Sequence, residues 1–273
     1  MSKIVLITGG ARGIGAATAG ELARRGWVPV LADVDEEALA ASAFETVVLD
    51  VRDAAACERA VAEVVERHGR LDAVWANAGI GTFAPLAASE PEAWERTVEI
   101  NLLGAFRTVR AALPAVTASR GYVAVTASLA SFAHGPGMSA YAASKAGVEA
   151  MCNSLRIEVA HHGVAVGTIH PSWIDTDMVR AAHEEPAYRR LREALRPPFR
   201  KTYPVERAAR DIADGFDRRA RRICTPRFVL LAHVLRAATT TRVFERDALA
   251  AAPDIERLFE AGAAERGVTS EVP

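Results

Sequence analysis

The chain has 273 residues, of which 50% are hydrophobic and 25% are charged, and its formal net charge at pH 7 is -1. A chain of this length and apolar content is long enough to bury one α/β core, and its composition argues against intrinsic disorder. Because the net charge is close to zero, the sequence offers no global electrostatic attraction to nucleic acid or to an anionic membrane.

The cysteines and the first residues indicate a reduced compartment. Cys57, Cys152 and Cys224 lie far apart, with no CxxC or Cys/His spacing typical of a metal site or of a disulfide framework. A predicted strand follows Met1 almost directly, which leaves no room for a signal peptide, and no apolar run reaches the length of a membrane span. We therefore expect a cytoplasmic protein with no metal site and no integral membrane segment.

Apolar runs of strand length alternate with longer amphipathic segments of helical period along most of the chain. The predicted strands are residues 3–8, 27–33, 45–51, 71–77, 121–128 and 164–171, with a last short one at 221–226. Helices are predicted between them, for example over 16–26, 53–69 and 91–116. Parallel strands buried on both faces are continuous apolar runs, so this order predicts an α/β fold: a Rossmann-type doubly wound parallel sheet of about seven strands with helices on both faces.

Two places depart from this regular pattern. Pro29 removes a backbone donor from a predicted interior strand, so a local break is expected there. After residue 225 the pattern changes to an apolar segment bordered by arginines, followed by one or two predicted surface helices. Residues 1–225 are therefore predicted to form the sheet domain, and residues 226–273 a helical extension of the same domain.

A glycine-rich turn, TGGARGIG (8–15), joins the first predicted strand to the first helix. In this position Gly9 permits a tight turn, Gly13 a close backbone approach and Gly15 close packing of the helix on the strand. Backbone N–H groups and the helix N-terminus can then bind a pyrophosphate, and we assign Ile14 to the same site. A turn that is merely tight is the alternative interpretation.

The residue at the end of the second predicted strand bears on the choice of dinucleotide. Asp33 lies about twenty residues after the glycine-rich turn, where a carboxylate accepts hydrogen bonds from ribose hydroxyls and repels a 2′-phosphate. Arg12 favours the opposite choice, because a basic side chain next to Gly13 can pair with that phosphate. The carboxylate is the stronger discriminator, so NAD is favoured over NADP. Asp33 is also typical of a helix cap, and both roles can coexist.

Two further strand ends supply polar or small residues at the same edge of the predicted sheet. Asp50, followed by Val51, ends the third strand, where it can meet an adenine amino group. Asn77, Ala78 and Gly79 end the fourth strand, where a turn of small residues lets a ribose approach. An ordinary loop explains this second segment equally well.

Three residues indicate the chemistry. Ser128 ends the fifth predicted strand, and Tyr141 and Lys145, four residues apart, project from one face of the following helix. A phenol has a pKa of about 10, so a base near neutral pH needs that pKa to fall by about 3 units. An ammonium group about 4 Å away supplies about that much at an effective dielectric constant near 20. Taken without the other motifs, Tyr141 and Lys145 are also typical of an incidental pair on a helix surface.

This combination resembles the short-chain dehydrogenase/reductase family, in its short single-domain branch. The resemblance covers about residues 3 to 225 and rests on TGGARGIG (8–15), Asp33, LDV (49–51), NAG (77–79), Asn101, Ser128 in VTAS, YAASK (141–145) and HPSWIDT (170–176), in the family's order. The glycine spacing G-x-x-x-G-x-G also matches this branch. The resemblance implies that residues 1–225 are a dinucleotide-binding and catalytic domain.

The resemblance implies a role for each matching residue. Tyr141 exchanges a proton with the substrate oxygen, and Ser128 hydrogen-bonds that oxygen. Lys145 lowers the pKa of Tyr141 and binds the nicotinamide-ribose, and Asn101 holds a water that relays protons. The implied catalytic residues are Asn101, Ser128, Tyr141 and Lys145; the implied cofactor residues are Gly9, Arg12, Gly13, Ile14, Gly15, Asp33, Asp50, Val51, Asn77, Ala78, Gly79, Tyr141, Lys145, Pro171, Ile174 and Thr176.

One residue departs from the family's pattern. Ser172 stands where a glycine usually follows Pro171, so a positive φ there would bring modest backbone strain. Without a positive φ, the Ser172 side chain can reach the ligand. Beyond it, the resemblance implies that Thr176 and the backbone of Ile174 hold the nicotinamide carboxamide.

The sequence indicates the type of reaction more clearly than the identity of the substrate. Residues 129–138, 172–173 and a predicted lid at 177–204 are expected to line the pocket, with His134 and Trp173 as candidates for contact. The lid's arginines attract an acidic substrate or simply solvate a helix, and the second interpretation is favoured. His161 and His162 are interpreted as surface residues, since no further metal ligand is suitably spaced.

The apolar segment 228–235 is unusually hydrophobic for an exposed helix. It is expected to pack on a partner subunit, to cover the pocket, or to make weak peripheral contact with a membrane through residues 226–245. The last two alternatives suit a bulky apolar alcohol or ketone. The resemblance also implies a homodimer or a homotetramer.

These observations favour an NAD-dependent oxidoreductase that transfers a hydride between nicotinamide and a secondary alcohol or ketone. An NADP-dependent ketoreductase is the first alternative. A catalytically idle NAD-binding sensor or scaffold is a second alternative from another class. The intact set of Asn101, Ser128, Tyr141 and Lys145 argues against the scaffold, which has no need of all four.

Overall fold

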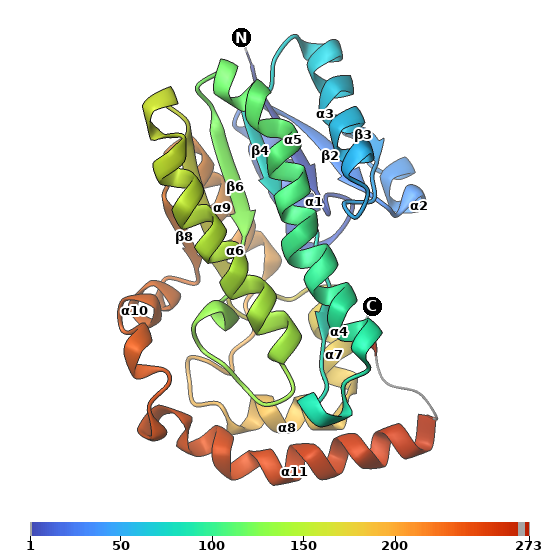
Figure 1. Ribbon diagram of the computed structural model, residues 1–273, viewed down its shortest axis with the longest axis vertical. Helices are drawn as coiled ribbons and strands as arrows, with labels where there is room; N and C mark the ends of the chain where they lie inside the picture. Colours follow the sequence, from blue (N-terminus) through green and yellow to red (C-terminus); the bar gives the residue numbers. More distant parts are fainter. Residues whose placement is uncertain (1, 267–270, 273) are drawn as a thin grey trace.

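The computed structural model describes residues 2–266 and 271–272, and its centre is a twisted parallel sheet (Figure 1). Within these residues seven parallel strands lie in the order β3-β2-β1-β4-β6-β7-β8. The strands are β1 (Lys3–Thr8), β2 (Trp27–Asp33), β3 (Glu45–Val48), β4 (Ala73–Ala76), β6 (Tyr122–Thr126), β7 (Ala165–Pro171) and β8 (Arg222–Thr225). The predicted doubly wound sheet is confirmed, and every strand lies inside a predicted run.

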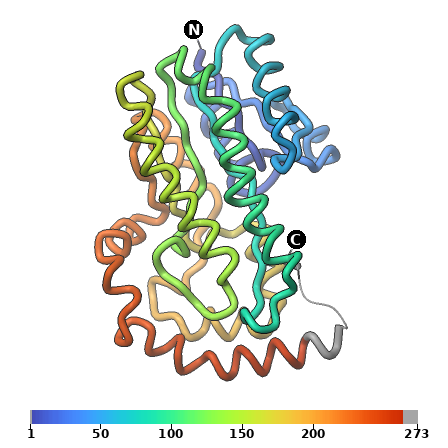
Figure 2. The backbone as a smooth tube through the Cα atoms, in the orientation of Figure 1, coloured from blue at the N-terminus to red at the C-terminus, as the bar shows by residue number. Residues whose placement is uncertain are grey.

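Helices cover both faces of this sheet, and each layer shares a separate hydrophobic core with the strands (Figures 1 and 2). The helices of one face are α3 (Ala54–His68), α5 (Ala105–Ala118) and α6 (Ser139–Glu158). Those of the other face are α1 (Gly13–Arg24), α2 (Glu36–Ala40) and α9 (Val205–Asp217). The strand order reverses between β1 and β4, and sheets of this kind bind ligands beyond the carboxyl ends of the strands at such a point.

The remaining helices gather near that end of the sheet (Figure 1). They are α4 (Pro91–Val98), which leads through a π-helical turn (Glu99–Gly104) into α5, and α7 (Asp177–Glu184), α8 (Pro186–Ala194), α10 (Phe228–Val234) and α11 (Arg242–Arg266). The long helix α11 packs along α8, and the two share a third hydrophobic core that includes Leu191 and Ile255. A small antiparallel pair, β5 (Gly81–Thr82) with β9 (Glu271–Val272), lies apart from the main sheet.

The local break expected at Pro29 does not occur. Strand β2 runs continuously from Trp27 to Asp33, and Pro29 is in register with Val5 of β1. The neighbour on the other side, β3, begins to pair only at Val30. Pro29 therefore lies where β2 has no neighbour on that side, and its missing N–H group interrupts nothing there.

None of the helices within the described residues is both long enough and apolar enough to span a bilayer. His161 and His162 are exposed at a short turn after α6, as predicted for surface residues. Cys57, Cys152 and Cys224 are all free thiols.

Phe216 on α9 is the aromatic centre of the core beneath α1 and α9. Its side chain is fully buried, and its ring meets Trp27, Trp75 and Tyr122 edge to face at centroid distances of 5.9, 5.8 and 5.2 Å.

Phe216→Ala should lower the free energy of unfolding by about 3–5 kcal/mol, because it removes buried area and leaves a cavity. Urea denaturation measures this loss. Val243→Ala, at a position that is 87% exposed, is the control and should change stability by less than about 0.5 kcal/mol. Equal effects of the two substitutions would contradict this account of the core.

Candidate active site

The glycine-rich turn makes a backbone cradle at the start of α1. Gly9 and Gly13 have φ angles of +62° and +55°, a conformation that side chains disfavour. A Cβ atom at Gly9 would lie 2.7 Å from the Cα atom of Ala78, so the turn also packs directly on the end of β4. The first turn of α1 has no acidic residue and no side-chain cap, which leaves its N–H groups available to an anion.

Ile14 and Gly15, in the first turn of α1, hold the helix against the sheet. Ile14 packs on the core beneath α1, and a Cβ atom at Gly15 would lie 2.3 Å from the Gly9 carbonyl oxygen. Thr176 lies on the other side of the cradle, 3.4 Å from where a Cβ of Gly13 would be. The structure thus brings the first and last of the predicted cofactor motifs together.

Asp33 lies at the end of β2 beside this cradle. Its Oδ2 accepts the Ala11 N–H at 3.1 Å, and its Oδ1 accepts the N–H groups of Val34 and Asp35 at 2.8 and 3.2 Å. Carboxylate oxygens have further lone pairs, so these bonds fix the orientation of Asp33 and still allow it to accept hydrogen bonds from a sugar. Asp33 is not the cap of α2; that cap is Asp35, whose Oδ1 accepts the Ala38 N–H.

Arg12 is paired with an acidic neighbour. Its guanidinium donates to Asp35 Oδ2 at 2.6 Å. Hydrogen bonds from the Ala38 N–H and from Arg12 lower the pKa of Asp35, which keeps the partner ionised near neutral pH. A phosphate near Arg12 would have to compete with this carboxylate.

The ends of β3 and β4 contribute differently. The Asp50 carboxylate is bound by the Arg52 guanidinium, which lowers the pKa of Asp50, and Val51 beside it is buried. Asn77 joins three elements: its Nδ2 donates to the Gly9 carbonyl at 2.9 Å, and its Oδ1 accepts from Thr126 Oγ1 at 3.0 Å. The side chain of Asn77 therefore holds the cradle in place.

Asn101 lies in the π-helical turn between α4 and α5 and is 1% exposed. Its amide side chain accepts the Ile80 N–H at 2.8 Å and donates to the Ile80 carbonyl and to Ser144 Oγ at 2.9 and 3.2 Å. A Cβ atom at Gly79 would lie 2.9 Å from Asn101 Oδ1 and 3.3 Å from Lys145 Nζ. Gly79, Asn101 and Lys145 therefore meet at one point, and their packing requires a glycine.

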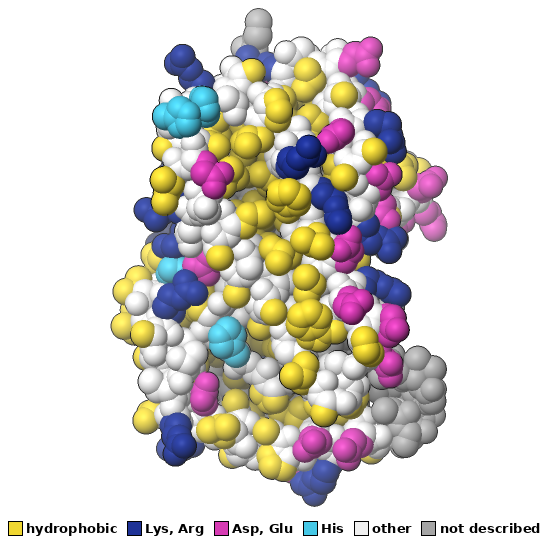
Figure 3. Space-filling model, in the orientation of Figure 1, with side chains coloured by type: hydrophobic (Ala, Val, Ile, Leu, Met, Phe, Trp, Pro, Cys, Tyr) yellow, Lys and Arg dark blue, Asp and Glu magenta, His cyan; other side chains and the backbone are white. Residues whose placement is uncertain are grey.

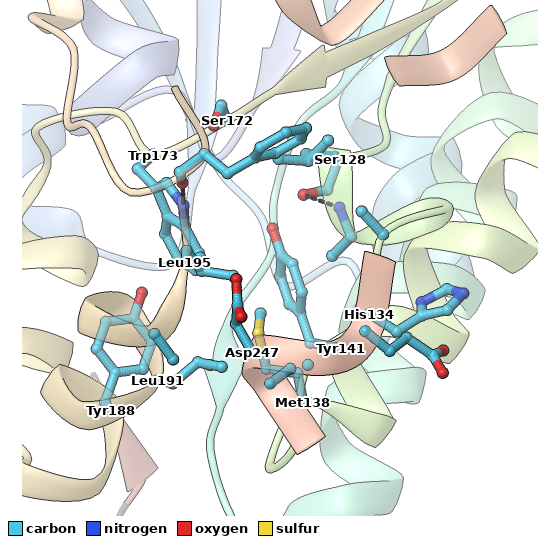
Figure 4. A pocket seen from close by; sticks show the side chains of 18 of the residues that line it. Ser128, His134, Met138, Tyr141, Ser172, Trp173, Tyr188, Leu191, Leu195 and Asp247 are labelled. Carbon is cyan, nitrogen blue, oxygen red and sulfur yellow. Dashed lines mark hydrogen bonds between the residues drawn. The ribbon is translucent and has the colours of Figure 1, made fainter. Parts of the chain in front are cut away.

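Tyr141 and Lys145 occupy successive turns of α6. Lys145 is 3% exposed, and its Nζ donates to the Thr126 carbonyl at the end of β6 at 2.9 Å. The same Nζ lies 5.7 Å from the centroid of the Tyr141 ring. In Figure 4 the Tyr141 hydroxyl points towards Ser128.

Burial dominates the acid-base properties of this pair. It lowers the pKa of Lys145 to about 8 and raises the pKa of Tyr141, although a hydrogen bond with Ser128 lowers the Tyr141 value in part. The ammonium of Lys145 lies over the ring and is bound to Thr126, so it does not offset the burial of the phenol in this arrangement. The pKa lowering that the sequence analysis attributes to Lys145 remains a prediction.

Ser128 begins a short 3₁₀ turn (Leu129–Ser131) after β6. Its Oγ accepts the Ala130 N–H at 3.1 Å, its own N–H donates to Ser131 Oγ, and Ser131 Oγ donates to the Lys145 carbonyl at 3.0 Å. This turn is therefore tied to α6 beside Lys145, which fixes Ser128 relative to Tyr141.

The motif after β7 forms the opposite wall. Ser172 has no positive φ, so replacing the family's glycine brings no backbone strain, and its N–H donates to the Thr225 carbonyl at 2.9 Å. Pro171 ends β7 in register with Thr225, Ile174 bridges to Tyr203, and Thr176 caps α7. These contacts hold the predicted carboxamide-binding segment rigidly.

A cavity of about 520 Å³ lies over Ser128 and Tyr141 (Figure 4). Its wall is mostly apolar and includes Phe83, Met138, Trp173, Tyr188, Leu191 and Phe244. The three segments expected to line a pocket, at 129–138, 172–173 and 177–204, all contribute, as do His134 and Ser172. Residues 238–248 of the extension line it as well.

Sequence reasoning did not find several of these neighbours. Phe83 reaches the cavity from the segment after β4, which has no motif of its own. Glu149, His170 and His233 come together in a buried cluster beneath the site, with ligand-type atoms within 4.8 Å of one another. The four-residue spacing of Tyr141, Lys145 and Glu149 was the available sign for one member of this cluster.

The described residues fit a dinucleotide. The cradle leaves no space for side chains at Gly9, the uncapped start of α1 suits a pyrophosphate, and Asp33 faces the same region as a hydrogen-bond acceptor. Among the described residues Lys145 has one hydrogen-bond acceptor for its three N–H donors, so it can also bind a ribose hydroxyl.

The buried Lys145 should make stability depend on pH in a specific range. Its pKa is about 8 in the fold and 10.5 in an unfolded reference, so its charged form destabilises the fold below about pH 8. This penalty disappears as pH rises from 8 to 10.5. The difference between the two pKa values is equivalent to about 3 kcal/mol of folding free energy. The free energy of unfolding of the unmodified protein, minus that of Lys145→Met, should therefore rise by about this amount over that range. Denaturant titrations at several pH values measure it, and a flat difference would refute the buried ammonium.

Comparisons with known proteins agree with this geometry. The short chain dehydrogenase family profile matches residues 3–187. An uncharacterised NAD-dependent oxidoreductase of Mycobacterium tuberculosis is 36% identical over 201 residues, or 65% of this chain and 73% of that protein. A (-)-trans-carveol dehydrogenase of Rhodococcus erythropolis is 32% identical over 228 residues, or 74% of this chain and 81% of that protein. The crystal structure of a short chain dehydrogenase/reductase from Burkholderia phymatum in complex with NAD has a TM-score of 0.75 and 26% identity, covering 87% of this chain and 93% of that one. The chain therefore belongs to the short-chain dehydrogenase/reductase family of oxidoreductases.

Proposed function

We propose that the protein is an NAD-dependent oxidoreductase that transfers a hydride between nicotinamide and a bulky, uncharged secondary alcohol or ketone. The main support is the placement of Tyr141 and Ser128 side by side at a mostly apolar cavity of about 520 Å³. A cavity of this size suits a substrate of many carbon atoms, and its apolar wall favours removal of such a substrate from water.

Each catalytic residue has a distinct task in the proposed reaction. The bound NAD supplies the hydride acceptor at its nicotinamide ring. Tyr141 accepts the proton of the substrate hydroxyl during oxidation and donates it during reduction, and Ser128 hydrogen-bonds the same oxygen. Lys145 binds ribose through the N–H donors that the Thr126 carbonyl leaves free. Asn101 holds the adjoining segment at Ile80 in position.

The charges around the cavity favour a neutral substrate. The cationic lining residue Arg196 pairs with Asp247, and Glu245 adds a second negative charge. Four of the other lid arginines have partners among the described residues: Arg180 with Asp175 and Asp177, Arg190 with Asp254, and Arg189 and Arg192 with backbone carbonyls. Arg200 is exposed to solvent. These pairings argue against attraction of an acidic substrate and support the solvated-helix interpretation of the lid.

A different ion pair, between Arg12 and Asp35, supports NAD over NADP. Asp33 lies at the end of β2 next to the cradle, and the guanidinium of Arg12 is bound to Asp35. A 2′-phosphate in this region would meet negative charge without a free counter-ion from Arg12.

Exposed apolar side chains fit an assembly of several copies. Hydrophobic side chains gather over α5 and α6 on the face shown in Figure 3. Phe106 on α5 and Ile157 on α6 are 48% and 80% exposed. Leu231 and Val234 on α10 are 62% and 70% exposed. Burying such surface favours association, as the implied homodimer or homotetramer requires.

Replacing the proposed acid-base group tests the mechanism. Tyr141→Phe should lower kcat by at least about 100-fold, because the substrate oxygen loses its proton partner. Binding of NAD, followed by fluorescence titration, should remain. Tyr203→Phe, at a buried tyrosine outside the cavity lining, is the matched control and should keep normal turnover. Unchanged turnover in Tyr141→Phe would exclude this mechanism, and NAD binding without turnover on any alcohol in a broad panel would favour a sensor or scaffold.

The choice of dinucleotide has its own test. The unmodified protein should bind NAD at least about tenfold more tightly than NADP, because a 2′-phosphate beside Asp33 places like charges in contact. Asp33→Asn removes that negative charge and keeps the shape of the side chain, so it should reduce the ratio of NAD affinity to NADP affinity. Asp53→Asn, at the acidic cap of α3, is the control and should leave the ratio unchanged. Tighter binding of NADP by the unmodified protein would overturn the assignment.

A further inference from the structure

A buried carboxylate continues the row of catalytic side chains on α6. Glu149 follows Lys145 by four residues, as Lys145 follows Tyr141, and Glu149 is only 2% exposed. Its Oε2 has no hydrogen-bond partner among the described residues. Burying a carboxylate costs free energy unless the charge is paired and hydrogen-bonded, so the partners of Glu149 decide whether it is tolerated at this position.

Those partners come from the C-terminal extension. His233 Nε2, at the end of α10, donates to Glu149 Oε1 at 2.8 Å, and the Arg236 guanidinium donates to the same oxygen at 2.7 Å. Burial acts to raise the pKa of Glu149, but the His233 hydrogen bond and nearby positive charges outweigh it, so the pKa is lowered and Glu149 is ionised. We call Glu149, His233 and Arg236 the clasp.

The clasp also lies against the turn that contains Ser128. His233 packs edge to face on Phe132 at 5.0 Å, and Arg236 lies 5.5 Å from the centre of the same ring. Thr239 Oγ1 donates to the Phe132 carbonyl, and Val229 on α10 belongs to the same apolar cluster. The extension is therefore attached to the residues that directly follow the catalytic serine.

His170 makes a second connection between this cluster and Ser128. Burial lowers the pKa of His170 to about 4, so the ring is neutral near pH 7. The Ser128 carbonyl only accepts, so His170 Nδ1–H donates to it at 3.1 Å and Nε2 accepts from Thr168 Oγ1 at 2.9 Å. The His170 ring then packs on His233 at 5.5 Å.

The same cluster resembles a metal site in composition, but its contacts argue against one. Both nitrogens of His170 are already hydrogen-bonded, to the Ser128 carbonyl and to Thr168. Arg236 already neutralises the Glu149 carboxylate by binding its Oε1, and its positive charge repels a cation at either oxygen. An ion pair with the extension is the better account of this carboxylate.

The residues that follow the clasp form a wall of the cavity. Ala238, Thr241, Val243, Phe244, Asp247 and Ala248 all line it, and the first of them lies two positions after Arg236. Residues 242–248 are the first turns of α11, and the later part of α11 is anchored on α8, so residues 236–248 are fixed at one end by the clasp and at the other by that helix pair.

We propose that the clasp is a specificity-determining element: His233 and Arg236 bind Glu149 and thereby hold residues 238–248 as the distal wall of the substrate cavity. These three are positioning residues, since they act through the wall and not on the reacting atoms. A small alcohol at Tyr141 does not need the distal wall, whereas a bulky substrate does. The clasp should therefore affect the two substrate classes differently, an inference that rests on the proposed function.

Arg236→Met tests this proposal. It removes one charged hydrogen bond to Glu149, so kcat/KM for a bulky cyclic alcohol should fall by about tenfold, mainly through KM. The kcat for a small secondary alcohol should remain within about twofold. Arg236→Lys, which keeps the cation, should recover most of the loss, and Arg218→Met, at an exposed arginine at the end of α9 and outside the cavity lining, should behave like the unmodified protein.

Hydrogen-deuterium exchange gives a readout that does not depend on any substrate. In Arg236→Met and in Glu149→Gln the backbone amides of residues 238–248 should exchange about tenfold faster, while those of β6 stay unchanged. Unchanged exchange, or an equal loss of kcat/KM for small and bulky alcohols, would overturn the clasp. Stoichiometric Zn²⁺ binding by the unmodified protein that disappears in Glu149→Gln would also overturn it, in favour of a metal site. Faster exchange without turnover on any alcohol would support the clasp while refuting the proposed function.

Discussion

The hydrogen bond from Lys145 Nζ to the Thr126 carbonyl fixes the geometry on which the rest of the site depends. A buried ammonium requires oxygen acceptors, and the carboxyl end of β6 provides one at 2.9 Å. This contact sets the position of α6 along the sheet, and with it the height of Tyr141 above the strand ends. It also contributes to the lack of space for a side chain at Gly79, where a Cβ atom would lie 2.9 Å from Asn101 Oδ1 and 3.3 Å from the same Nζ. The residues that follow β4 and β6 are therefore constrained by one charged group.

Around that fixed point, the proposed cofactor residues and the residues of the proposed substrate cavity come from different parts of the fold. The cradle, Asp33 and Asn77 come from β1, β2 and β4, whose pairing in the sheet places them in one crevice regardless of what covers it. The cavity wall comes largely from helices outside the sheet, where α8 and α11 share their own hydrophobic core. Changes in that core can therefore alter the shape of the cavity while the sheet, and the groups attached to it, stay in place. The physical basis is that the two regions bury different apolar surfaces.

The sequence was informative where local pattern and local chemistry coincide. Buried parallel strands appear as continuous apolar runs, so each of the seven strands of the main sheet lay inside a predicted one, and the spacing of Tyr141 and Lys145 placed them on one helix face. Prediction failed at Pro29 because the extent of β3, which decides whether a missing N–H matters, is not visible in the residues of β2. The partners of Arg12 and Glu149 were also beyond reach: Asp35 belonged to a neighbouring turn with no motif, and His233 and Arg236 lie 84 and 87 positions away along the chain from Glu149. Such contacts arise from packing and not from spacing.

The row Tyr141, Lys145 and Glu149 suggests why substrate selection can be coupled to chemistry in this chain without a moving part. Eight residues of helix span about 12 Å, and a helix buried against a sheet over that length behaves as a rigid rod. In the proposed reaction Tyr141 defines where the reacting oxygen lies, and in the proposed clasp Glu149, at the other end of the row, defines through the extension where the distal wall stands. The distance between the reacting atom and that wall is thus set within a single helix. A substrate that fills the space between them is oriented for reaction by its own size, because its far end meets residues 238–248 when its oxygen meets Tyr141 and Ser128.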